Sequence, residues 1–311
     1  MSERKHLDLE ELSTVRDLLR YAVSRFNEAG LFFGHGSASA WDEAVHLVLH
    51  RLRLPLDKLE PFLDARLTAQ ERRVVLDVIA RRVDERMPAA YLTGEAWLGD
   101  YRFKVDPRVI VPRSFIAELL FERLAPWIAT PDDIGRVLDL CTGSACLAII
   151  AADAFPNARV DAADLSRDAL EVARINVDDY GLAERVELIE SDLFERLDGR
   201  RYDLIVTNPP YVNDTSMGLL PEEYRREPRI ALAGGADGLD LVRRILNAAS
   251  RMLTADGLLV VEVGHERPHV EAAFPRLPIT WLSTSGGDDA VFAVRAAELA
   301  TRSGTNRKRS R

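Results

Sequence analysis

From Arg136 onward, short apolar runs alternate with longer amphipathic segments, and this alternation constrains the fold more than any other feature of the chain. The runs RVLDLC, RVDAAD, RVELIES, YDLIVTN and GLLVVEVG are typical of strands, whereas SACLAIIAADAF, RDALEVARINVDDYG and GLDLVRRILNAASRML have helical periodicity. Strands that alternate with helices form a mostly parallel sheet with helices on both faces. The last apolar runs, TWLS and DDAVFAVRA, are expected to pair as an antiparallel edge. The sequence therefore predicts an α/β fold for this part of the chain.

The N-terminal part of the chain predicts a separate helical domain over residues 1–90. STVRDLLRYAVSRFNEAG places its apolar residues at helical spacing, with Ser13 as the expected N-cap and Gly30 as the stop. SAWDEAVHLVLHRLRL repeats this pattern. TAQERRVVLDVIARRVDERM begins with Thr68 and Glu71 at the spacing of a capping box.

Two further segments complete the predicted organisation. YLTGEAWLGDYRFKVDPRVIVP alternates apolar and polar residues around a turn signal at Gly99, and we interpret residues 91–112 as a β-hairpin linker. The α/β domain then covers residues 113–297. Residues 298–311 are basic and lack apolar periodicity, which predicts a disordered tail.

Composition narrows the class of protein. Of the 311 residues, 47% are hydrophobic and 29% are charged, as in an ordinary soluble globular protein. No apolar run is long enough to span a bilayer and the charged start MSERKHLDLEE is no signal peptide, so a cytoplasmic enzyme is expected. The net charge of −9 disfavours broad electrostatic binding to nucleic acid, although it does not exclude a local basic patch. Cys141 and Cys146 have neither disulfide nor zinc spacing, so no metal is expected.

Small residues follow the first strand of the α/β domain, where a helix is predicted to begin: Thr142, Gly143, Ser144 and Ala145. They let a ligand approach the backbone, whose N–H groups at a helix start bind anionic or polar groups. Cys141 stands where the first glycine of a dinucleotide fingerprint would fall, which disfavours a pyrophosphate. An ordinary strand-to-helix turn is the alternative.

Acidic residues accompany successive strands. Asp139 lies in the first strand, Asp164 ends the second, and Asp192 follows the third with Leu193 beside it. A carboxylate after the second strand can accept both hydroxyls of a ribose, and one after the third can reach an adenine amino group. Each aspartate alone could equally be a surface residue. Together they favour an adenosine-containing ligand without a pyrophosphate, such as S-adenosylmethionine, with its amino-acid end along residues 142–145.

The stretch IVTNPPYVND ends a predicted strand on Asn208, Pro209, Pro210 and Tyr211. A planar amide or exocyclic amine is a poor nucleophile because its lone pair is delocalised. The Asn208 side-chain oxygen and the Pro209 carbonyl can accept its two N–H groups, in a backbone that proline makes rigid. Tyr211 can pack on the planar group. We therefore predict Asn208–Tyr211 as catalytic, with Asn208 also bordering the cofactor; a purely structural turn is the alternative.

The order DLCTGSA, DAADLS, SDLF and NPPY resembles the seven-stranded S-adenosylmethionine-dependent methyltransferases, and more narrowly the HemK-like protein-(glutamine-N(5)) methyltransferases. The resemblance covers about residues 10–297. YAVSRFNEAGLFFGHGSASAWDEAVHLVLHRLRLPLD and LPEEYRREPRIALAGGADGLDLVRRIL are similar to the branch that methylates a large-subunit ribosomal protein. PRSFIAE, where the family has PRP-x-T-E, points away from the release-factor branch. The common family turn has glycines where Cys141 and Ala145 stand.

This resemblance implies a Rossmann-like methyltransferase domain behind a helical substrate-recognition domain. It implies S-adenosylmethionine as the cofactor, bound by Asp139, Thr142, Gly143, Asp164 and Asp192, and a glutamine held by the NPPY stretch. The implied reaction methylates the side-chain amide nitrogen of a glutamine in a large-subunit ribosomal protein. That substrate would be free or on an assembling ribosome, with a contact to rRNA through the basic tail as a further option.

Other functions stay open at this point. One is methylation of a glutamine in release factors. Another is a nucleic-acid amino methyltransferase, because the exocyclic amine of adenine or guanine poses the same chemical problem and a flipped base would stack on Tyr211. An inactive scaffold that binds a ribosomal protein or rRNA is a third. A nucleotide-dependent oxidoreductase is disfavoured by the missing glycine fingerprint.

Overall fold

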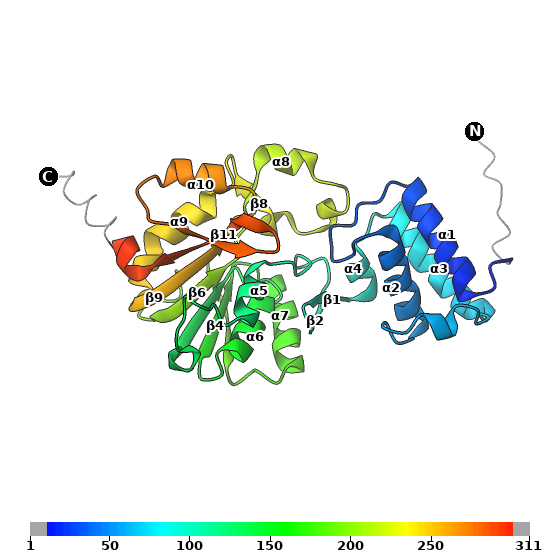
Figure 1. Ribbon diagram of the computed structural model, residues 1–311, viewed down its shortest axis with the longest axis horizontal. Coiled ribbons are helices and arrows are strands. Elements are labelled where there is room, and N and C mark those ends of the chain that lie inside the picture. The colour runs from blue at the N-terminus through cyan, green and yellow to red at the C-terminus, as the bar shows by residue number, and fades with distance from the viewer. Residues whose placement is uncertain (1–10, 301–311) are drawn as a thin grey trace. The chain divides into compact units, whose positions relative to one another are not determined.

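The structure is a computed structural model that describes residues 11–300 of the chain (Figure 1). The chain forms two compact units. The first unit extends to Glu95 and includes Pro221–Arg226, and the second contains Ala96–Leu220 and the chain from Glu227 onward. The predicted disordered tail, residues 298–311, is wrong at its start, because residues 298–300 are helical and Leu299 is buried; the rest of it lies outside the described residues.

Among its residues that the structure describes, the first unit contains four helices and two 3₁₀ turns. They are α1 (Val15–Glu28), α2 (Ala40–Leu52), α3 (Ala69–Asp84), α4 (Ala89–Thr93), η2 (Glu60–Phe62) and η4 (Tyr224–Arg226). The helices of the second unit include α5 (Ile116–Phe121), α6 (Cys146–Ala154), α7 (Arg167–Asp179), α8 (Asp214–Leu219), α9 (Asp240–Ala248) and α10 (Arg267–Ala273). Its 3₁₀ turns are η3 (Pro131–Asp133), η5 (Arg229–Ala231) and η6 (Ala249–Arg251).

The strands form one large sheet and two small ones. The large sheet contains β3 (Arg136–Leu140), β4 (Arg159–Asp164), β5 (Val186–Glu190), β6 (Tyr202–Thr207), β9 (Leu253–Glu262), β10 (Thr280–Thr284) and β11 (Gly287–Arg295). The small sheets pair β1 (Glu95–Leu98) with β2 (Tyr101–Lys104), and β7 (Val212–Asn213) with β8 (Ala233–Gly235).

Capping residues set the helix boundaries in the first unit. Thr14 and Asp17 form a capping box at the start of α1. The predicted N-cap Ser13 is wrong by one residue, because it is the Thr14 hydroxyl that accepts from Asp17 N, at 3.2 Å, while the Asp17 carboxylate accepts from Thr14 N at 2.9 Å. Gly30 follows α1 with φ +58°, as a helix stop requires. The predicted capping box of Thr68 and Glu71 is confirmed at the start of α3.

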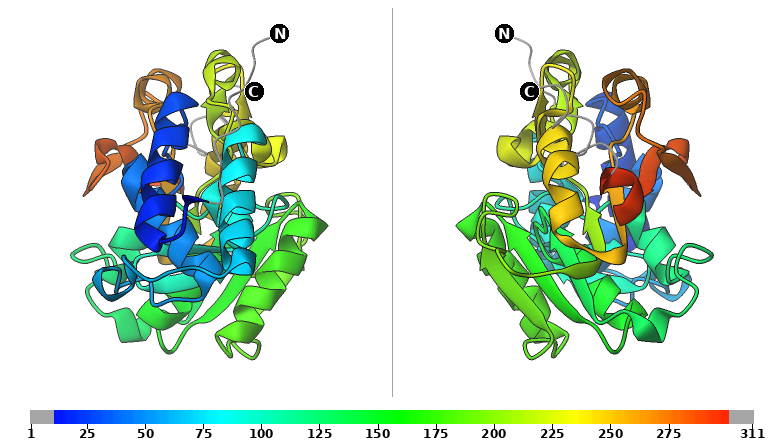
Figure 2. Two further views of the ribbon diagram at one scale, coloured as in Figure 1. Left: turned by 90° about the vertical axis from the view of Figure 1, so that its right-hand side faces the viewer. Right: turned by 90° about the vertical axis from the view of Figure 1, so that its left-hand side faces the viewer.

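The large sheet confirms the predicted α/β fold. Its strand order is β10-β11-β9-β6-β3-β4-β5, and the strands from β9 to β5 run parallel. β10 and β11 form the predicted antiparallel edge. The helices α5, α6 and α7 pack together on one face, and the core of the other face includes side chains from α9 and α10 (Figures 1 and 2).

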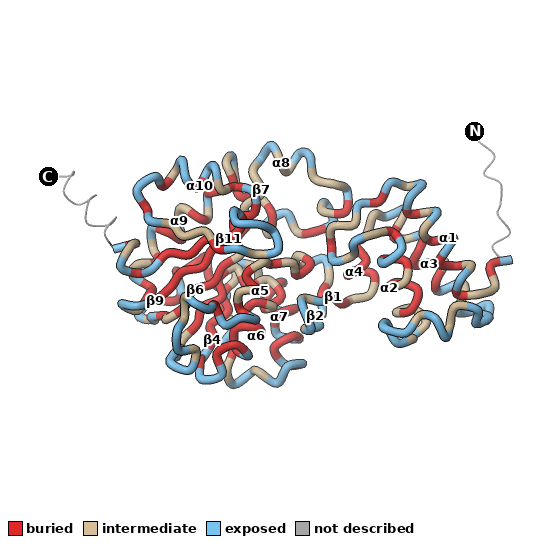
Figure 3. The backbone as a smooth tube through the Cα atoms, viewed as in Figure 1, coloured by how far each residue is buried: buried red, intermediate tan, exposed pale blue. Residues whose placement is uncertain are grey.

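Both faces of the central strands are apolar, as a covered parallel sheet requires. Leu138 of β3 and Ile205 of β6 are completely buried on one face, and Val137 and Leu204 of the same strands are completely buried on the other. Figure 3 shows these strands as an extensively buried part of the second unit. Across residues 11–300, no helix combines the length and hydropathy that a bilayer crossing requires.

The hairpin β1–β2 is shorter than the predicted range 91–112, because part of that range is helical. Pro88 precedes α4, and Gly94 ends it in the left-handed region at φ +76°. Asn176 of α7 holds the hairpin to the rest of the second unit. Its Oδ1 accepts from Lys104 N at 2.7 Å, and its Nδ2 donates to the Lys104 carbonyl at 3.1 Å and to the Ser144 carbonyl at 2.9 Å.

The exchange Asn176→Ala should lower the free energy of unfolding by about 2–4 kcal/mol. Asn176 is buried, and its loss leaves the carbonyl of the buried Ser144 without this partner at about 1–3 kcal/mol, whereas the backbone groups of the exposed Lys104 can bind water and cost less. The exposed Asn157, which donates one hydrogen bond to the Asp132 carbonyl, is the matched control; Asn157→Ala should change stability by less than about 0.5 kcal/mol. Urea unfolding measures both values, and equal effects would contradict this account.

Candidate active site

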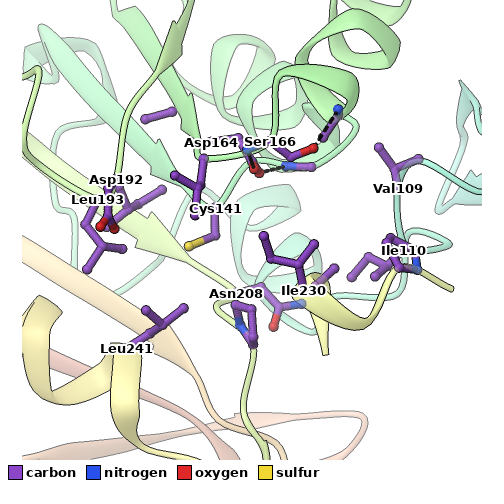
Figure 4. Close-up of a pocket in the computed structure, with 18 of the residues that line it drawn as sticks. Val109, Ile110, Cys141, Asp164, Ser166, Asp192, Leu193, Asn208, Ile230 and Leu241 are labelled. Carbon is purple, nitrogen blue, oxygen red and sulfur yellow. Dashed lines mark hydrogen bonds between the residues drawn. The ribbon is translucent and has the colours of Figure 1, made fainter. Parts of the chain in front are cut away.

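A cavity of about 360 Å³ lies at the carboxyl edge of the large sheet (Figure 4). Its wall contains seven of the residues predicted from the sequence: Cys141, Gly143, Asp164, Asp192, Leu193, Asn208 and Pro210. The remaining predicted residues are Asp139, Thr142, Ser144, Ala145, Pro209 and Tyr211, which lie behind or beside the wall rather than in it. The cavity therefore gathers residues from the ends of β3, β4, β5 and β6, as parallel strands allow.

The turn after β3 has an unusual backbone. Cys141, Gly143 and Ala145 all have left-handed φ values, of 63°, 56° and 64°. For residues with a Cβ atom this conformation costs about 1–2 kcal/mol, which explains why glycine suits such positions. A Cβ atom added to Gly143 would meet no atom within 4 Å, so the turn leaves open space beside its backbone. A polar ligand can approach this backbone directly.

Asp139 supports the turn from behind. Its Oδ2 accepts from Thr142 Oγ1 at 2.5 Å and from the backbone N–H of Ala148 in α6 at 3.0 Å. Burial raises the pKa of the Asp139 carboxyl to about 7, against the lowering effect of these two hydrogen bonds. Asp139 thus joins the turn to α6. It affects the cavity indirectly, because it holds the turn in place.

Asp164 stands in the cavity wall with both oxygens already engaged. Oδ2 accepts from Gly143 N at 2.9 Å, and Oδ1 accepts from Ser166 N at 2.8 Å (Figure 4). Burial raises the pKa of this carboxyl, against the lowering effect of its backbone hydrogen bonds. Each carboxylate oxygen has more than one acceptor position, so each can accept a further donor from a ligand.

Asp192 is paired with Arg244 of α9, with 2.9 Å between Oδ2 and the guanidinium NH2. Both residues line the cavity. The sequence analysis missed Arg244, and it also missed the apolar wall residues Val109, Ile230 and Leu241. Nothing in the sequence marked these residues as ligand contacts. The periodicity of a helix or the composition of a turn does not reveal which side chains face a ligand.

Asn208 follows β6 and lines the cavity. Figure 4 shows its side chain and the Cys141 side chain directed toward the same space. Thr207, the last residue of β6, donates its hydroxyl to the Leu140 carbonyl at 2.7 Å and so fixes the end of β6 to β3. This bond holds the start of the NPPY stretch at the edge of the sheet.

Tyr211 is engaged outside the cavity wall. Its hydroxyl donates to Glu262 Oε1 at 3.5 Å, and a Cβ atom added to Gly264 would lie 2.6 Å from its ring. Glu262 is buried at the end of β9 and also accepts from Ser114 Oγ at 2.6 Å and Phe115 N at 2.9 Å. Burial raises the pKa of Glu262 to about 7. The sequence analysis missed this carboxylate because it lies in an apolar strand pattern.

A second buried carboxylate joins two parts of the cavity wall. Glu227 forms a two-pronged ion pair with Arg113, with NH1–Oε1 and NH2–Oε2 distances of 2.6 Å, and it accepts from Val111 N at 2.8 Å. The neighbouring residues Ile110 and Pro228 both line the cavity. The pair therefore fixes the segment before α5 against the segment after the NPPY loop.

These features fit an adenosine-containing ligand. The cavity offers the Asp164 and Asp192 carboxylates to hydroxyl and amino groups, apolar side chains such as Leu193 and Ile230 to a ring system, and the open backbone at Gly143 to a polar end. The Asn208 amide stands at the same cavity, where it can orient a second reactant.

Comparisons with known proteins agree with this chemistry. The family model of the methyltransferase small domain matches residues 117–220. The ribosomal protein uL3 glutamine methyltransferase of Bordetella pertussis is 63% identical over 94% of this chain and 98% of that protein. Proteins of the same name from Burkholderia pseudomallei and Neisseria gonorrhoeae are 62% and 60% identical, over 92% and 93% of this chain and 95% and 97% of those proteins.

A solved structure also matches, that of the ribosomal protein L11 methylase from Lactobacillus delbrueckii subsp. bulgaricus. Its TM-score is 0.43 at 19% identity, over 61% of this chain and 82% of that chain. A similarity this distant carries no argument about function.

The exchange Glu262→Gln should remove a pH dependence of stability. Because the pKa of Glu262 is raised from 4.5 to about 7 on folding, its contribution is fully present below about pH 4.5 and is lost as the pH rises through about 7. A shift of this size corresponds to about 3 kcal/mol. Glutamine does not ionise, so the variant should gain up to about 3 kcal/mol relative to wild type between about pH 5 and pH 8.

Urea unfolding at each pH measures this difference. Asp139 titrates in the same direction, but it is present in both proteins and cancels. The control Glu271→Gln makes the same exchange at a half-exposed carboxylate. Parallel curves of stability against pH for wild type and Glu262→Gln would contradict the raised pKa of Glu262.

Proposed function

Because the chain belongs to the family of the ribosomal protein uL3 glutamine methyltransferases, we propose that it methylates the side-chain amide nitrogen of a glutamine in uL3. It is an S-adenosylmethionine-dependent protein-glutamine N-methyltransferase. The single observation that carries the proposal is the joint presence of Asp164, Gly143 and Asn208 at one cavity. The first two suit the methyl donor, and the third suits a planar amide.

S-adenosylmethionine supplies a methyl group bound to a positively charged sulfur. In this proposal Asp164 accepts the two ribose hydroxyls through the acceptor positions that Gly143 N and Ser166 N leave free. Asp192 accepts the adenine amino group, and its ion pair with Arg244 keeps the carboxylate in place. The open backbone at Gly143 receives the amino-acid end.

The chain's contribution to the transfer is orientation and electrostatics. The Asn208 side-chain oxygen and the Pro209 carbonyl accept the two N–H groups of the glutamine amide, which directs its lone pair at the methyl group. The acceptors are preorganised, because Thr207 fixes the strand end and the prolines fix the turn. No acid–base residue is required, since the nitrogen loses its proton to water after the transfer.

Other parts of the proposal concern the partner. We assign the selection of uL3 to the helical domain of residues 1–90, which the linker 91–112 joins to the methyltransferase domain 113–297. A uL3 substrate that is free or on an assembling ribosome, a contact of the basic tail with rRNA and a cytoplasmic location belong to the same proposal. Release factors and nucleic acid are the alternative substrates.

Radiolabelled methyl transfer distinguishes these substrates. The protein is incubated with labelled S-adenosylmethionine and, separately, with free uL3, uL3 bound to rRNA, a release factor and rRNA alone. The expected label lies in uL3, on a glutamine identified by peptide mass spectrometry. Label in the release factor or in nucleic acid, with none in uL3, would contradict the proposal.

The exchange Asp164→Ala should weaken S-adenosylmethionine binding by about tenfold or more. Each charge-assisted hydrogen bond to a ribose hydroxyl contributes about 1.5–3 kcal/mol. Calorimetry measures the affinity, and circular dichroism checks that the variant folds. Asp179→Ala, at an exposed carboxylate at the end of α7, is the control and should bind as wild type does. An unchanged affinity of folded Asp164→Ala for S-adenosylmethionine would show that Asp164 does not bind the donor.

The exchange Asn208→Ala should lower kcat by about 100- to 1,000-fold, because it removes one preorganised acceptor worth about 2.7–4 kcal/mol in comparable sites. Asn208→Asp keeps an acceptor, so its kcat should lie between those of wild type and Asn208→Ala. The aspartate charge also favours the positive sulfur of the donor, so donor affinity should be kept or raised. Asn247→Ala, at an exposed position of α9, is the control. Wild-type turnover by both Asn208 variants would show that Asn208 only shapes the turn.

A further inference from the structure

A short segment of the chain belongs to a different unit from its neighbours in sequence. Residues 221–226 are part of the helical first unit, whereas Leu220 and Glu227 on either side of them belong to the second. The segment follows the NPPY stretch and α8, and it precedes the cavity residues Pro228 and Ile230. The chain between α8 and the cavity residues Pro228 and Ile230 thus contains residues that the helical unit holds.

Glu223 is the main anchor of this segment. Its side chain is 2% exposed, and its Oε1 accepts from Arg82 NH1 at 3.2 Å, from Phe32 N at 3.1 Å and from Arg86 NH1 at 3.4 Å. All three donors lie in the helical unit. A carboxylate buried in this way is stable only with such partners, so the segment is fixed at this position.

Arg82 is itself built into the core of the helical unit. Its side chain is 1% exposed, and Nε donates to Glu43 Oε1 at 2.6 Å while NH2 donates to the Phe32 carbonyl at 3.0 Å. The guanidinium also lies over the Phe33 ring, 5.9 Å from its centroid. Glu223 therefore supplies one of several acceptors to a rigid buried cation.

Tyr224 provides a second anchor beside the first. Its hydroxyl donates to the Gly34 carbonyl at 3.2 Å, and its ring lies 4.4 Å from the His35 ring and 5.7 Å from the Phe32 ring, between centroids. A Cβ atom added to Gly34 would come within 2.5 Å of the Tyr224 hydroxyl. A side chain at position 34 would have to displace the Tyr224 hydroxyl, so Gly34 allows the close contact between these two segments.

The chain is held again four positions later, in the other unit. Glu227 is bound by Arg113 and Val111 N, as described for the cavity. Between Glu223 and Glu227 the side chains of Arg225 and Arg226 are exposed, so the two glutamates and Tyr224 supply the anchoring.

We propose that Glu223 is a positioning residue for methyl transfer: by fixing residues 221–226 in the helical unit, it sets the loop that leads from α8 to the cavity residues Pro228 and Ile230 for the protein substrate. The inference rests on the proposed function. Gly143, Asp164 and Asp192 lie outside this loop, so donor binding depends on Glu223 much less than turnover of the protein substrate does. The helical unit thereby acts on the reaction through its hold on the loop.

Limited trypsin digestion tests the anchor without any substrate. In Glu223→Ala, cleavage after Arg225 or Arg226 should become about tenfold faster or more, because the segment opens locally more often. The control Glu222→Ala removes a side chain that is 65% exposed and pairs with Arg86 at 3.7 Å, and it should be cleaved as wild type is. Equal cleavage of Glu223→Ala and wild type would overturn the anchor.

Kinetics on uL3 test the positioning role. Glu223→Ala should lose about tenfold or more in kcat, with S-adenosylmethionine affinity within about threefold of wild type, and Glu223→Gln should recover part of the loss because it keeps the acceptor. Unchanged kcat would overturn the positioning role, and so would equal losses in kcat and donor affinity. If Glu223→Ala does not fold, Tyr224→Phe replaces it in both assays. Failure of wild type to methylate uL3 would contradict the proposed function, while the digestion still decides the anchor.

Discussion

The paired hydrogen bonds that Asp164 accepts from Gly143 N and Ser166 N are the constraint on which the rest of the site depends. They join the turn after β3 to the end of β4, which are neighbours in the parallel sheet. The turn can take its left-handed backbone because Asp139 supports it from behind. One carboxylate thus shapes the open backbone and also presents acceptors to the cavity.

Buried carboxylates perform the same task elsewhere in the molecule. Glu262 joins the end of β9 to Ser114 and Tyr211, and Glu227 joins Arg113 to the segment after the NPPY loop. Glu223 fixes its own segment to Arg82. A loop without the regular backbone hydrogen bonds of a helix or sheet cannot hold a reactive group by itself. These carboxylates fix the loops instead, through charge-assisted hydrogen bonds.

Much of the fold was predictable from local pattern. Alternating strands and helices gave the parallel sheet and its antiparallel edge, and small residues after β3 indicated the turn. The sequence analysis expected the N-cap at Ser13 instead of Thr14, because the pattern did not take the Asp17 carboxylate into account. Glu262, Arg244 and Glu223 were missed for a common reason. Their partners are distant in sequence, and no local spacing reveals which carboxylate a fold will bury against which donor.

A structure of the protein with S-adenosylhomocysteine and a glutamine-containing uL3 peptide measures the central claim most directly. The account predicts that the glutamine amide nitrogen lies about 2.7–3.2 Å from both the Asn208 side-chain oxygen and the Pro209 carbonyl. It also predicts the ribose hydroxyls on Asp164. An amide nitrogen that lies beyond hydrogen-bonding distance of both acceptors, with the peptide bound at the cavity, would contradict it.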